Sequence, residues 1–440
     1  MKKVAIIGAG MAGAGAAWFL RKAGCEVSVF EREDFVGGRT HTHRGDGFHC
    51  NTGAGFFTNF YPLLRALVKE TGLDHEVREN PKQVTLAKED QHFAYQLDSA
   101  LSFFRIPFLS FSDKLRVLRL TIALTLKKKR LDLVDPEALS AFDTESIANF
   151  ALRKVGRNAF ENIVRSAIEP YWYFASEQGS AAMLMALQAH AAGARFFTLT
   201  SGMDSLARTL FSDMDVRLST PVQSLALPRS GGTVIEAASG PSLHFDAAVF
   251  ATTASAATHL LRPHTEKVPS DLFDFLASQT YASNINAYYH VPQAYIQGMS
   301  PQISPITSDN HGLAAIALHG SHVDTELHLG GSMLGAWLLD SSSRELLDED
   351  RSEAEIADHI WRTMRIYRSD LPAAMPALAK LNARREAIPL HAPGRYRLAA
   401  KAWQSQRPPL VVAGDCLATA TMEGALVSGR RAAHILTESF

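Results

Sequence analysis

The chain has 440 residues, of which 46% are hydrophobic, and its formal net charge is −1 at pH 7. This length exceeds one ordinary core, so roughly two or three domains are expected, and the near-neutral charge argues against a general nucleic-acid-binding protein. No stretch of about 20 apolar residues predicts a transmembrane helix, and the short apolar run after the initial lysines is not typical of a signal peptide. Three cysteines without paired spacing favour a reducing compartment, the cytoplasm.

The chain begins with the pattern of a strand, a glycine turn, a helix and a second strand. Residues 4–7 (VAII) form a short apolar run typical of a strand that is buried on both faces. Residues 11–23 follow a helical pattern, and residues 26–31 (EVSVFE) read as the second strand. Together these segments predict a β-α-β unit.

Three glycines in the turn of this unit have the spacing of a dinucleotide-binding motif. Gly8 allows the tight turn, Gly10 lets the backbone approach a pyrophosphate, and Gly13 lets the helix pack closely on the strand. The N terminus of the helix offers free N–H groups and a positive dipole to phosphates. Glu31 ends the second strand, where a carboxylate accepts hydrogen bonds from a ribose 2′-OH and repels a 2′-phosphate. The motif therefore predicts NAD or FAD and disfavours NADP.

The rest of the chain alternates between helical and strand-forming stretches. A helix is expected over residues 60–72, a mostly helical region over 97–170, and short strands from about residue 202 onward. Further strands are expected over 283–291, 312–319, 325–338 and 410–413, and a helix over 352–368. Because nucleotide-binding patterns occur at the start, near 216–222 and at the end, two interleaved domains are expected.

The stretch EREDFVGGRTHT distinguishes between the two cofactors. It places Gly37, Gly38 and Arg39 shortly after Glu31, and here the sequence resembles the flavin amine oxidase superfamily, which includes protoporphyrinogen oxidases, phytoene-type desaturases and amine oxidases. In that superfamily a GGR turn follows the second strand and its arginine lies beside the FAD. A guanidinium fork suits a pyrophosphate or a flavin edge. The resemblance therefore implies FAD as the cofactor.

Further matches extend the resemblance over the whole chain: NTGAGFF (51–57), GMDSLARTL (202–210) with VRLSTPVQSL, FDAAVFATTASAATHLL, EAIPLHAPGRY (386–396) and AGDCLATATMEGALVSGRRAA (413–433). By resemblance, Val222 touches adenine through its backbone and Asp415 bonds the ribityl or pyrophosphate part. The amides around Met422 and Glu423, at a helix N terminus, would face flavin N1 and O2 and stabilise the negative charge of the reduced flavin.

The resemblance implies the following cofactor-binding residues: Gly8, Gly10, Ala12, Gly13, Glu31, Arg32, Gly38, Arg39, Gly53, Ala54, Val222, Gly414, Asp415, Met422, Glu423 and Ala425. No cysteine matches a covalent flavin attachment, so FAD is expected to be held non-covalently. The implied fold is α/β, with a Rossmann-type FAD-binding domain of the GR2-like kind (1–75, 200–265 and 395–440). An α+β substrate-binding domain (76–199 and 266–394) is interleaved with it.

The sequence departs from amine oxidases at two positions near the flavin. Thr421 stands directly before the MEGA-like motif, where many amine oxidases have an aromatic residue, and Asn284 stands where many have a lysine. We expect the substrate-side residues to be Asn284, Tyr289, His391 and Thr421, and no metal.

The expected activity is FAD-dependent dehydrogenation of a small or lipophilic molecule at a C–N or C–C bond, by hydride transfer to flavin N5. O₂ or another acceptor would reoxidise the flavin. The alternatives are an amine oxidase proper, which releases H₂O₂, and a non-enzymatic escort protein of the same fold.

Three other stretches have two interpretations each. HTHRGDGFHC (41–50) fits either a metal site or a loop lining the active site. The aromatic residues of EPYWYFASE (169–177) fit either core packing or a wall of the substrate cavity. Residues 101–130 combine apolar residues with a basic end, so they fit either a packed helix with a solvated end or peripheral contact with a membrane.

Overall fold

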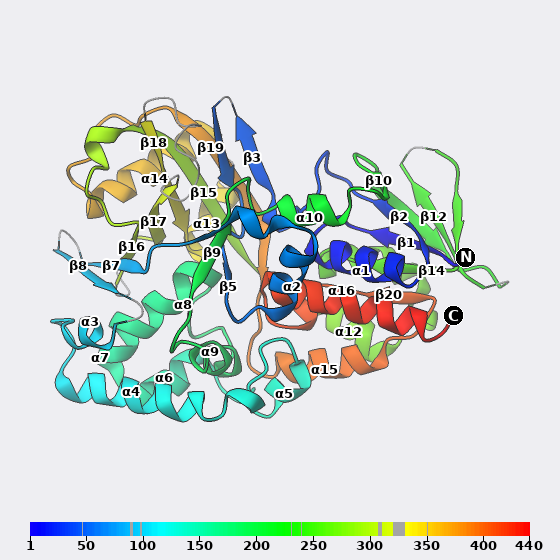
Figure 1. Cartoon of the computed structure of the whole chain (residues 1–440), viewed down its shortest axis with the longest axis horizontal. Helices are drawn as coiled ribbons and strands as arrows, with labels where there is room; N and C mark the ends of the chain where they lie inside the picture. Colours follow the sequence, from blue (N-terminus) through cyan, green and yellow to red (C-terminus); the bar gives the residue numbers. More distant parts are fainter. Residues whose placement is uncertain are drawn as a thin grey trace.

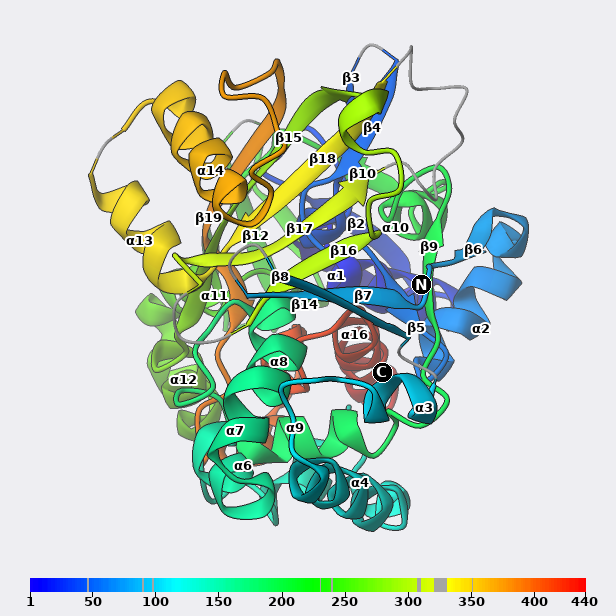
Figure 2. The same cartoon turned by 90° about the vertical axis from the view of Figure 1, so that its left-hand side faces the viewer.

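The computed structural model describes residues 1–45, 47–88, 91–96, 99–229, 231–238, 240–306, 310–319, 331–349 and 351–440. Figure 1 shows an elongated molecule in which both termini lie at one end, beside a parallel sheet, while a larger sheet occupies the other end. Helices from the first half of the chain lie below the larger sheet in this view (Figures 1 and 2). The part of the expected strand over residues 325–330 lies outside the described residues.

The parallel sheet has the strand order β10-β2-β1-β14-β20. Its strands are β1 (Lys3–Ile7), β2 (Glu26–Phe30), β10 (Asp215–Arg217), β14 (Ala247–Phe250) and β20 (Leu410–Val412). Successive residues of a strand enter different hydrophobic clusters: Ile6 belongs to one and Ile7 to the other. The sheet is therefore buried on both faces, as its continuous apolar runs predict.

Helices from distant parts of the chain cover the two faces of this sheet. One face packs against α1 (Met11–Lys22), α10 (Ser205–Leu210) and α16 (Met422–Thr437), and the other against α11 (Ala254–Leu261), α12 (Ser270–Ala277) and α15 (Arg395–Ser405). Helices α1 and α16 lie side by side (Figure 1). A Cβ atom on Gly429 would lie 2.2 Å from the carbonyl oxygen of Ala12, so this close approach requires glycine. The first and last helices of the chain are thus one packed layer.

The larger sheet has the strand order β19-β15-β18-β17-β16-β7-β8. Its strands are β7 (Gln83–Lys88), β8 (Gln91–Gln96), β15 (Tyr281–Pro292), β16 (Gln302–Pro305), β17 (Leu313–His319), β18 (Gly331–Leu338) and β19 (Leu378–Pro389). Helices α13 (Asp340–Asp348) and α14 (Glu353–Tyr367) lie on one face. The opposite face of β15 points toward the segment that contains Asn51 and Thr52. This second face belongs to the candidate site.

The remaining helices and strands connect the two sheets. The helices are α2 (Pro62–Glu70), α3 (Ala100–Phe104), α4 (Phe111–Thr125), α5 (Pro136–Ser140), α6 (Ile147–Val155), α7 (Arg157–Ala159), α8 (Arg165–Trp172) and α9 (Ala181–Gln188). A hairpin is formed by β3 (Thr42–Gly45) and β4 (Phe48–Asn51). One small sheet consists of β5 (Phe57–Thr58), β9 (Phe196–Leu199) and β6 (Val77–Glu79). Another consists of β11 (Val222–Ala226), β12 (Thr233–Ala237) and β13 (Leu243–Phe245). Within the described residues, no helix combines the length and the apolar character needed to cross a membrane.

Candidate cofactor site and active site

The glycine turn after β1 has the geometry of a phosphate cradle. Gly8 has φ +104°, and a Cβ atom there would lie 2.6 Å from the carbonyl oxygen of Ala251, so only glycine fits. A Cβ on Gly13 would lie 2.1 Å from the carbonyl oxygen of Gly8. A Cβ on Gly10, by contrast, would have no neighbour within 4 Å. The space in front of Gly10 is therefore open at the N terminus of α1, as a bound pyrophosphate requires.

Glu31 lies directly beside this turn at the end of β2. One of its carboxylate oxygens accepts a hydrogen bond from the amide of Ala9 at 2.6 Å, and the other accepts one from the amide of Glu33 at 3.0 Å. The side chain is buried, with 8% of its surface exposed. Arg32, in contrast, is exposed and forms a surface ion pair with Glu33 at 3.0 Å. The geometry fixes Glu31, but not Arg32, at the adenosine end of the predicted site.

Val222 is brought to the same end by backbone pairing. The amide of Thr220 donates to the carbonyl oxygen of Glu31 at 2.7 Å, and the amide of Ser219 donates to that of Glu33 at 2.8 Å. Strand β11 begins two residues after Thr220, at Val222. The segment expected to contact adenine therefore lies beside the acidic end of β2.

The GGR turn packs directly on the glycine turn. The amide of Gly37 donates to the carbonyl oxygen of Ala9 at 2.8 Å, and a Cβ atom on Gly38 would lie 3.2 Å from the Cα of Gly10. Gly53 packs against the next residue, Arg39, since a Cβ on Gly53 would lie 2.0 Å from the carbonyl oxygen of Arg39. The amide of Ala54 donates to that same oxygen at 3.0 Å. These predicted cofactor residues therefore form one layer.

Arg39 connects the N-terminal motif to the C-terminal motif. Its Nη2 donates to Asp415 Oδ1 at 2.6 Å, and its Nη1 donates to the carbonyl oxygen of Ala387 at 3.2 Å. Burial disfavours the charged form of Arg39, but the Asp415 carboxylate outweighs it and keeps the pKa of Arg39 above its ordinary value. Asp415 follows Gly414, whose amide donates to the Ser428 hydroxyl in α16 at 2.9 Å. Two residues that are both expected to contact FAD, one from each end of the chain, are thus joined by an ion pair.

Helix α16 begins at Met422 with Thr421 as its N-cap residue. The hydroxyl of Thr421 accepts a hydrogen bond from the amide of Gly424 at 2.9 Å. The amides of Met422 and Glu423 lie in the first turn, where helix geometry provides no acceptor within the helix. The N terminus of α16 therefore presents the amides of Met422 and Glu423 and a positive dipole end. The amide of Ala425, in contrast, already donates to the carbonyl oxygen of Thr421 at 3.0 Å.

The Glu423 side chain does not take part in this arrangement. Its two carboxylate oxygens accept hydrogen bonds from the amides of Leu63 and Leu64, each at 2.8 Å, at the start of α2. Burial raises the pKa of this carboxyl group. The expected role of Glu423 is therefore restricted to its backbone amide, because its carboxylate caps a different helix.

On the site-facing side of β15, side-chain amides form a network that the sequence did not reveal. Asn284 Nδ2 donates to the carbonyl oxygen of Leu338 at 2.8 Å, and Asn284 Oδ1 accepts from Asn286 Nδ2 at 3.0 Å. Asn286 and Asn382 both donate to the carbonyl oxygen of Thr52, at 3.3 and 2.8 Å. Asn286 Oδ1 is buried and has no partner among the described residues. Alternation along β15 from Asn284 would have identified Asn286.

Tyr289 was expected on the substrate side, and the structure corrects this. Its hydroxyl donates to the carbonyl oxygen of Ala357 in α14 at 2.7 Å, and its ring packs against Trp361 with centroids 5.0 Å apart. Successive residues of a strand point to opposite faces, so the neighbouring Tyr288 points toward the site instead. The Tyr288 hydroxyl donates to the carbonyl oxygen of Asn51 at 2.5 Å.

His391 is also a structural residue rather than part of a substrate-side surface. It is buried, its ring stacks on Tyr396 with centroids 4.8 Å apart, and its Nε2 lies 3.1 Å from the carbonyl oxygen of Cys416. Burial lowers the pKa of His391, so the neutral ring is favoured. His391 therefore stabilises the loop after β20 through its contact with Cys416.

Aromatic side chains from other segments surround Thr421. Trp172 Nε1 donates to the carbonyl oxygen of Ala420 at 3.3 Å, and the buried Tyr61 lies close to the Thr421 side chain. Phe174 is fully buried in the core, whereas the Tyr171 ring meets Phe56 edge-on at 5.6 Å. Of the residues in 169–177, Trp172 therefore lies against the C-terminal motif, while Phe174 has only a packing role.

No group of three or more His, Cys, Asp or Glu side chains within the described part of the chain is arranged to hold a metal ion. His41 stacks on Phe35 with centroids 3.7 Å apart, and Arg44 forms an ion pair with Asp204 at 2.7 Å. These contacts account for two of the polar residues in the stretch 41–50.

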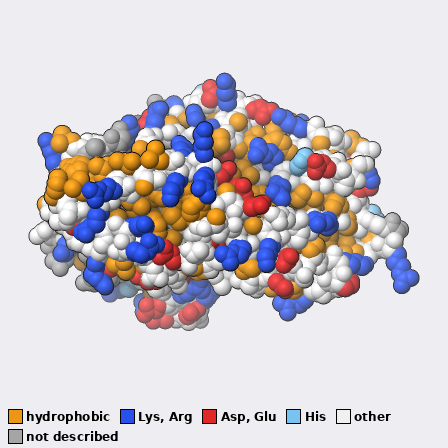
Figure 3. Space-filling view, turned by 90° about the horizontal axis from the view of Figure 1, so that it is seen from below, with side chains coloured by type: hydrophobic (Ala, Val, Ile, Leu, Met, Phe, Trp, Pro, Cys, Tyr) orange, Lys and Arg blue, Asp and Glu red, His pale blue; other side chains and the backbone are white. Residues whose placement is uncertain are grey.

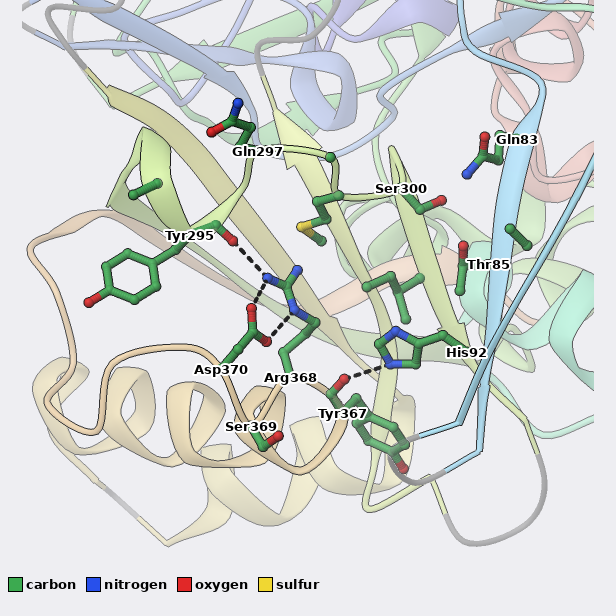
Figure 4. Close-up of a pocket in the computed structure, with 15 residues that line it drawn as sticks. Gln83, Thr85, His92, Tyr295, Gln297, Ser300, Tyr367, Arg368, Ser369 and Asp370 are labelled. Carbon is green, nitrogen blue, oxygen red and sulfur yellow. Dashed lines mark hydrogen bonds and ion pairs between the residues drawn. The ribbon is translucent and has the colours of Figure 1, made fainter.

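Figure 4 shows a separate cavity of about 520 Å³ between β7, β8 and the end of α14. Its central cation, Arg368, forms a double hydrogen bond with Asp370, at 2.7 Å for each contact, and donates to the carbonyl oxygen of Tyr295. This ion pair lowers the pKa of Asp370. None of the predicted site residues lines this cavity, so it is not the cofactor site.

Comparison with known proteins identifies the chain. Its fold is that of the flavin-dependent oxidoreductases. A family model described as flavin containing amine oxidoreductase matches residues 11–437, so the chain belongs to this family. The predicted superfamily, fold class and enzymatic nature are thereby confirmed.

Individual relatives match over shorter stretches. An L-amino-acid oxidase from Sistrurus catenatus edwardsii is 38% identical over 73 residues, which are 17% of this chain and 14% of that protein. A 1-hydroxycarotenoid 3,4-desaturase from Flavobacterium sp. (strain P99-3) is 47% identical over 58 residues, or 13% of this chain and 12% of that protein. Each match thus spans only a small part of the relative's length.

A solved structure matches over nearly the whole chain. Putrescine oxidase with bound putrescine is similar with a TM-score of 0.77 and 20% identity, covering 99% of this chain and 98% of that chain. At this identity the likeness establishes the shared fold.

Proposed function

We propose that the chain binds FAD non-covalently along the line from Glu31 through Arg39 and Asp415 to the N terminus of α16. The observation that carries this proposal is the 2.6 Å ion pair between Arg39 and Asp415, which joins two motifs separated by 376 positions. Glu31 would hold the ribose hydroxyls, the α1 N terminus the pyrophosphate, and the α16 N terminus the flavin edge that becomes negative on reduction. The open space at Gly10 fits such a ligand.

We propose that the reaction is the oxidation of a C–N or C–C bond in a small or lipophilic substrate. Bound FAD supplies the hydride acceptor in this chemistry. The side-chain amides of Asn284, Asn286 and Asn382 form a fixed polar surface, and an amide group does not titrate. This surface can orient a substrate by hydrogen bonds, but it provides no general base. Neutral amines and activated C–H groups fit these three residues, because such substrates donate hydride without prior proton removal.

Purified protein is expected to be yellow and to release its FAD on denaturation. The measurement is a visible spectrum, followed by heat precipitation and analysis of flavin in the supernatant and the pellet. Colourless protein that takes up no added FAD would refute FAD binding. Flavin that stays with the pellet would refute non-covalent binding.

Two substrate classes remain as proposals. The similarity to an L-amino-acid oxidase favours C–N oxidation with O₂ as acceptor and H₂O₂ as product. The similarity to a desaturase favours C–C oxidation, as does Thr421, which replaces the aromatic residue of many amine oxidases. Membership of an enzyme family argues against the escort interpretation. Anaerobic bleaching of the flavin by amines, porphyrinogens or polyenes, followed by readmission of O₂ with peroxide detection, separates these possibilities.

We also propose that α4 and the segment after it, named here the α4 surface, bind an anionic membrane. The exposed fractions of Phe111, Ile122 and Leu126 are 69%, 53% and 83%. Their spacing of 11 and 4 residues places them on one helix face, and the exposed basic run 127–130 follows directly. Figure 3 shows hydrophobic and basic side chains mixed on the side of the molecule seen from below, on which α4 lies. Apolar residues flanked by cations complement an anionic lipid surface.

The substitutions F111S, I122S and L126S, made together, are expected to reduce binding to phosphatidylserine-containing vesicles about tenfold or more, because each removes apolar contact area. Vesicle co-sedimentation at low and high salt measures this binding. L398S is the control, since Leu398 is 45% exposed on a different helix, α15. Wild-type protein that ignores these vesicles, or binds neutral vesicles equally well, would refute the proposal.

A further inference from the structure

Arg384 lies on the site-facing side of β19 and has no partner among the described residues. It pairs with Asn284 across the antiparallel ladder of β15 and β19, and directly opposite residues share a face. Asn382, two residues earlier on the same strand, bonds the carbonyl oxygen of Thr52 on that face. The neighbouring Arg385 points the other way and forms an ion pair with Asp348 at 2.7 Å. Arg384, in contrast, forms no hydrogen bond or ion pair with any residue that the structure describes.

The charged groups around Arg384 come from the N-terminal cofactor motif. Its pKa is lowered first by burial and then by the Arg39 guanidinium, while Glu33 and Glu31 oppose this effect and Arg32 adds to it. The charge of Arg384 also contributes to lowering the pKa of His41. A partly buried cation beside a second cation is unfavourable unless an anion compensates for it.

The carboxylates of this neighbourhood are already engaged. Glu31 accepts hydrogen bonds from the amides of Ala9 and Glu33, Glu33 pairs with Arg32, and Asp415 pairs with Arg39. The Gly37–Gly38 turn that precedes Arg39 packs on Gly10, whose outer side is open. An anion at that opening would meet the α1 N terminus on one side and the two guanidinium groups on the other.

We propose that Arg384 binds the pyrophosphate of the dinucleotide as a second cation opposite the N terminus of α1. The inference rests on the proposed binding of FAD. A guanidinium group matches two phosphate oxygens with parallel hydrogen bonds, which explains an arginine at this position. Because β19 belongs to the larger sheet and α1 covers the parallel sheet, the bound pyrophosphate would connect the two halves of the molecule.

The test uses flavin-free protein titrated with FAD, ADP and adenosine, followed by intrinsic fluorescence or calorimetry. R384Q is expected to weaken FAD and ADP binding roughly tenfold or more, the usual loss for a charged hydrogen bond. Adenosine, which has no phosphate, is expected to bind wild type and R384Q equally. R385Q is the matched control, because it removes the same charge from the opposite face of the same strand and should leave all three affinities unchanged. R384K is expected to restore part of the ADP affinity.

Several outcomes would overturn the proposal. One is R384Q protein that binds FAD and ADP as tightly as wild type does. Another is R384Q protein whose affinities for ADP and adenosine fall by the same factor, because this indicates a general structural defect. Unchanged FAD affinity with a raised KM for carboxylate substrates would show that Arg384 recognises substrate instead. Wild-type protein that binds neither FAD nor ADP would refute the proposed function as well. If wild type binds FAD and R384Q binds it equally well, only the role of Arg384 is refuted and the proposed function stands.

Discussion

Asp415→Ala protein is expected to emerge from purification with most of its flavin missing. The substitution removes a carboxylate expected to bond the cofactor and leaves the Arg39 guanidinium without its ion-pair partner. A hydrogen bond to a charged group contributes about 1.5–3 kcal/mol, so FAD affinity should fall roughly tenfold to a hundredfold. The flavin-to-protein absorbance ratio and a titration of flavin-free protein measure this loss.

The coupling between Asp415 and Arg39 can be separated from their individual effects. R39A is expected to weaken FAD binding by a similar factor, and the double variant by clearly less than the product of the two, since the residues act as one unit. D348A is the control for loss of a carboxylate paired with arginine, because Asp348 pairs with Arg385 away from the site. D415A protein that retains FAD as wild type does would contradict the assignment of this residue.

Local sequence patterns predict the N-terminal part of this site, but they do not predict contacts between segments that are distant in the sequence. The elements β1, α1 and β2 follow from neighbouring residues, since glycine spacing and apolar runs are local signals. The pairing of Arg39 with Asp415 depends on how strands separated by most of the chain come together, and no local pattern specifies that. Resemblance to a family placed both residues at the cofactor without indicating their contact.

On the substrate side, the sequence likewise does not determine which individual side chains face the site. Tyr288 and Tyr289 are equally plausible from composition, and only the register of β15 determines which one points toward Asn51. His391 is predicted at the flavin by its motif, yet tertiary packing against Tyr396 buries it. Arg384 carries no motif at all, and its significance follows from the absence of a partner among the described residues.

Glu423→Ala is expected to produce the largest loss of stability among simple substitutions near the site. Its carboxylate is 1% exposed and accepts two amide hydrogen bonds at the start of α2, where the first N–H groups have no acceptor within the helix. Removing it leaves two buried donors unsatisfied, each at a cost of about 1–3 kcal/mol. The free energy of unfolding should therefore fall by about 2–6 kcal/mol, measured by denaturant unfolding of flavin-free protein.

Two variants separate this capping role from a general effect of helix charge. E438A removes a carboxylate from just beyond the far end of α16. Glu438 is exposed and its carboxylate pairs with the exposed His434, so the effect of E438A should stay within about 0.5 kcal/mol. E423Q keeps one carbonyl oxygen but turns an NH₂ group toward a second donor, so its loss should lie between those of E438A and E423A. Equal unfolding midpoints for E423A and E438A would contradict the cap. The N terminus of α16 is also the part of the helix that we propose to face the cofactor. A cap that holds α2 against this turn would therefore link the stability of α2 to the geometry of the proposed flavin site.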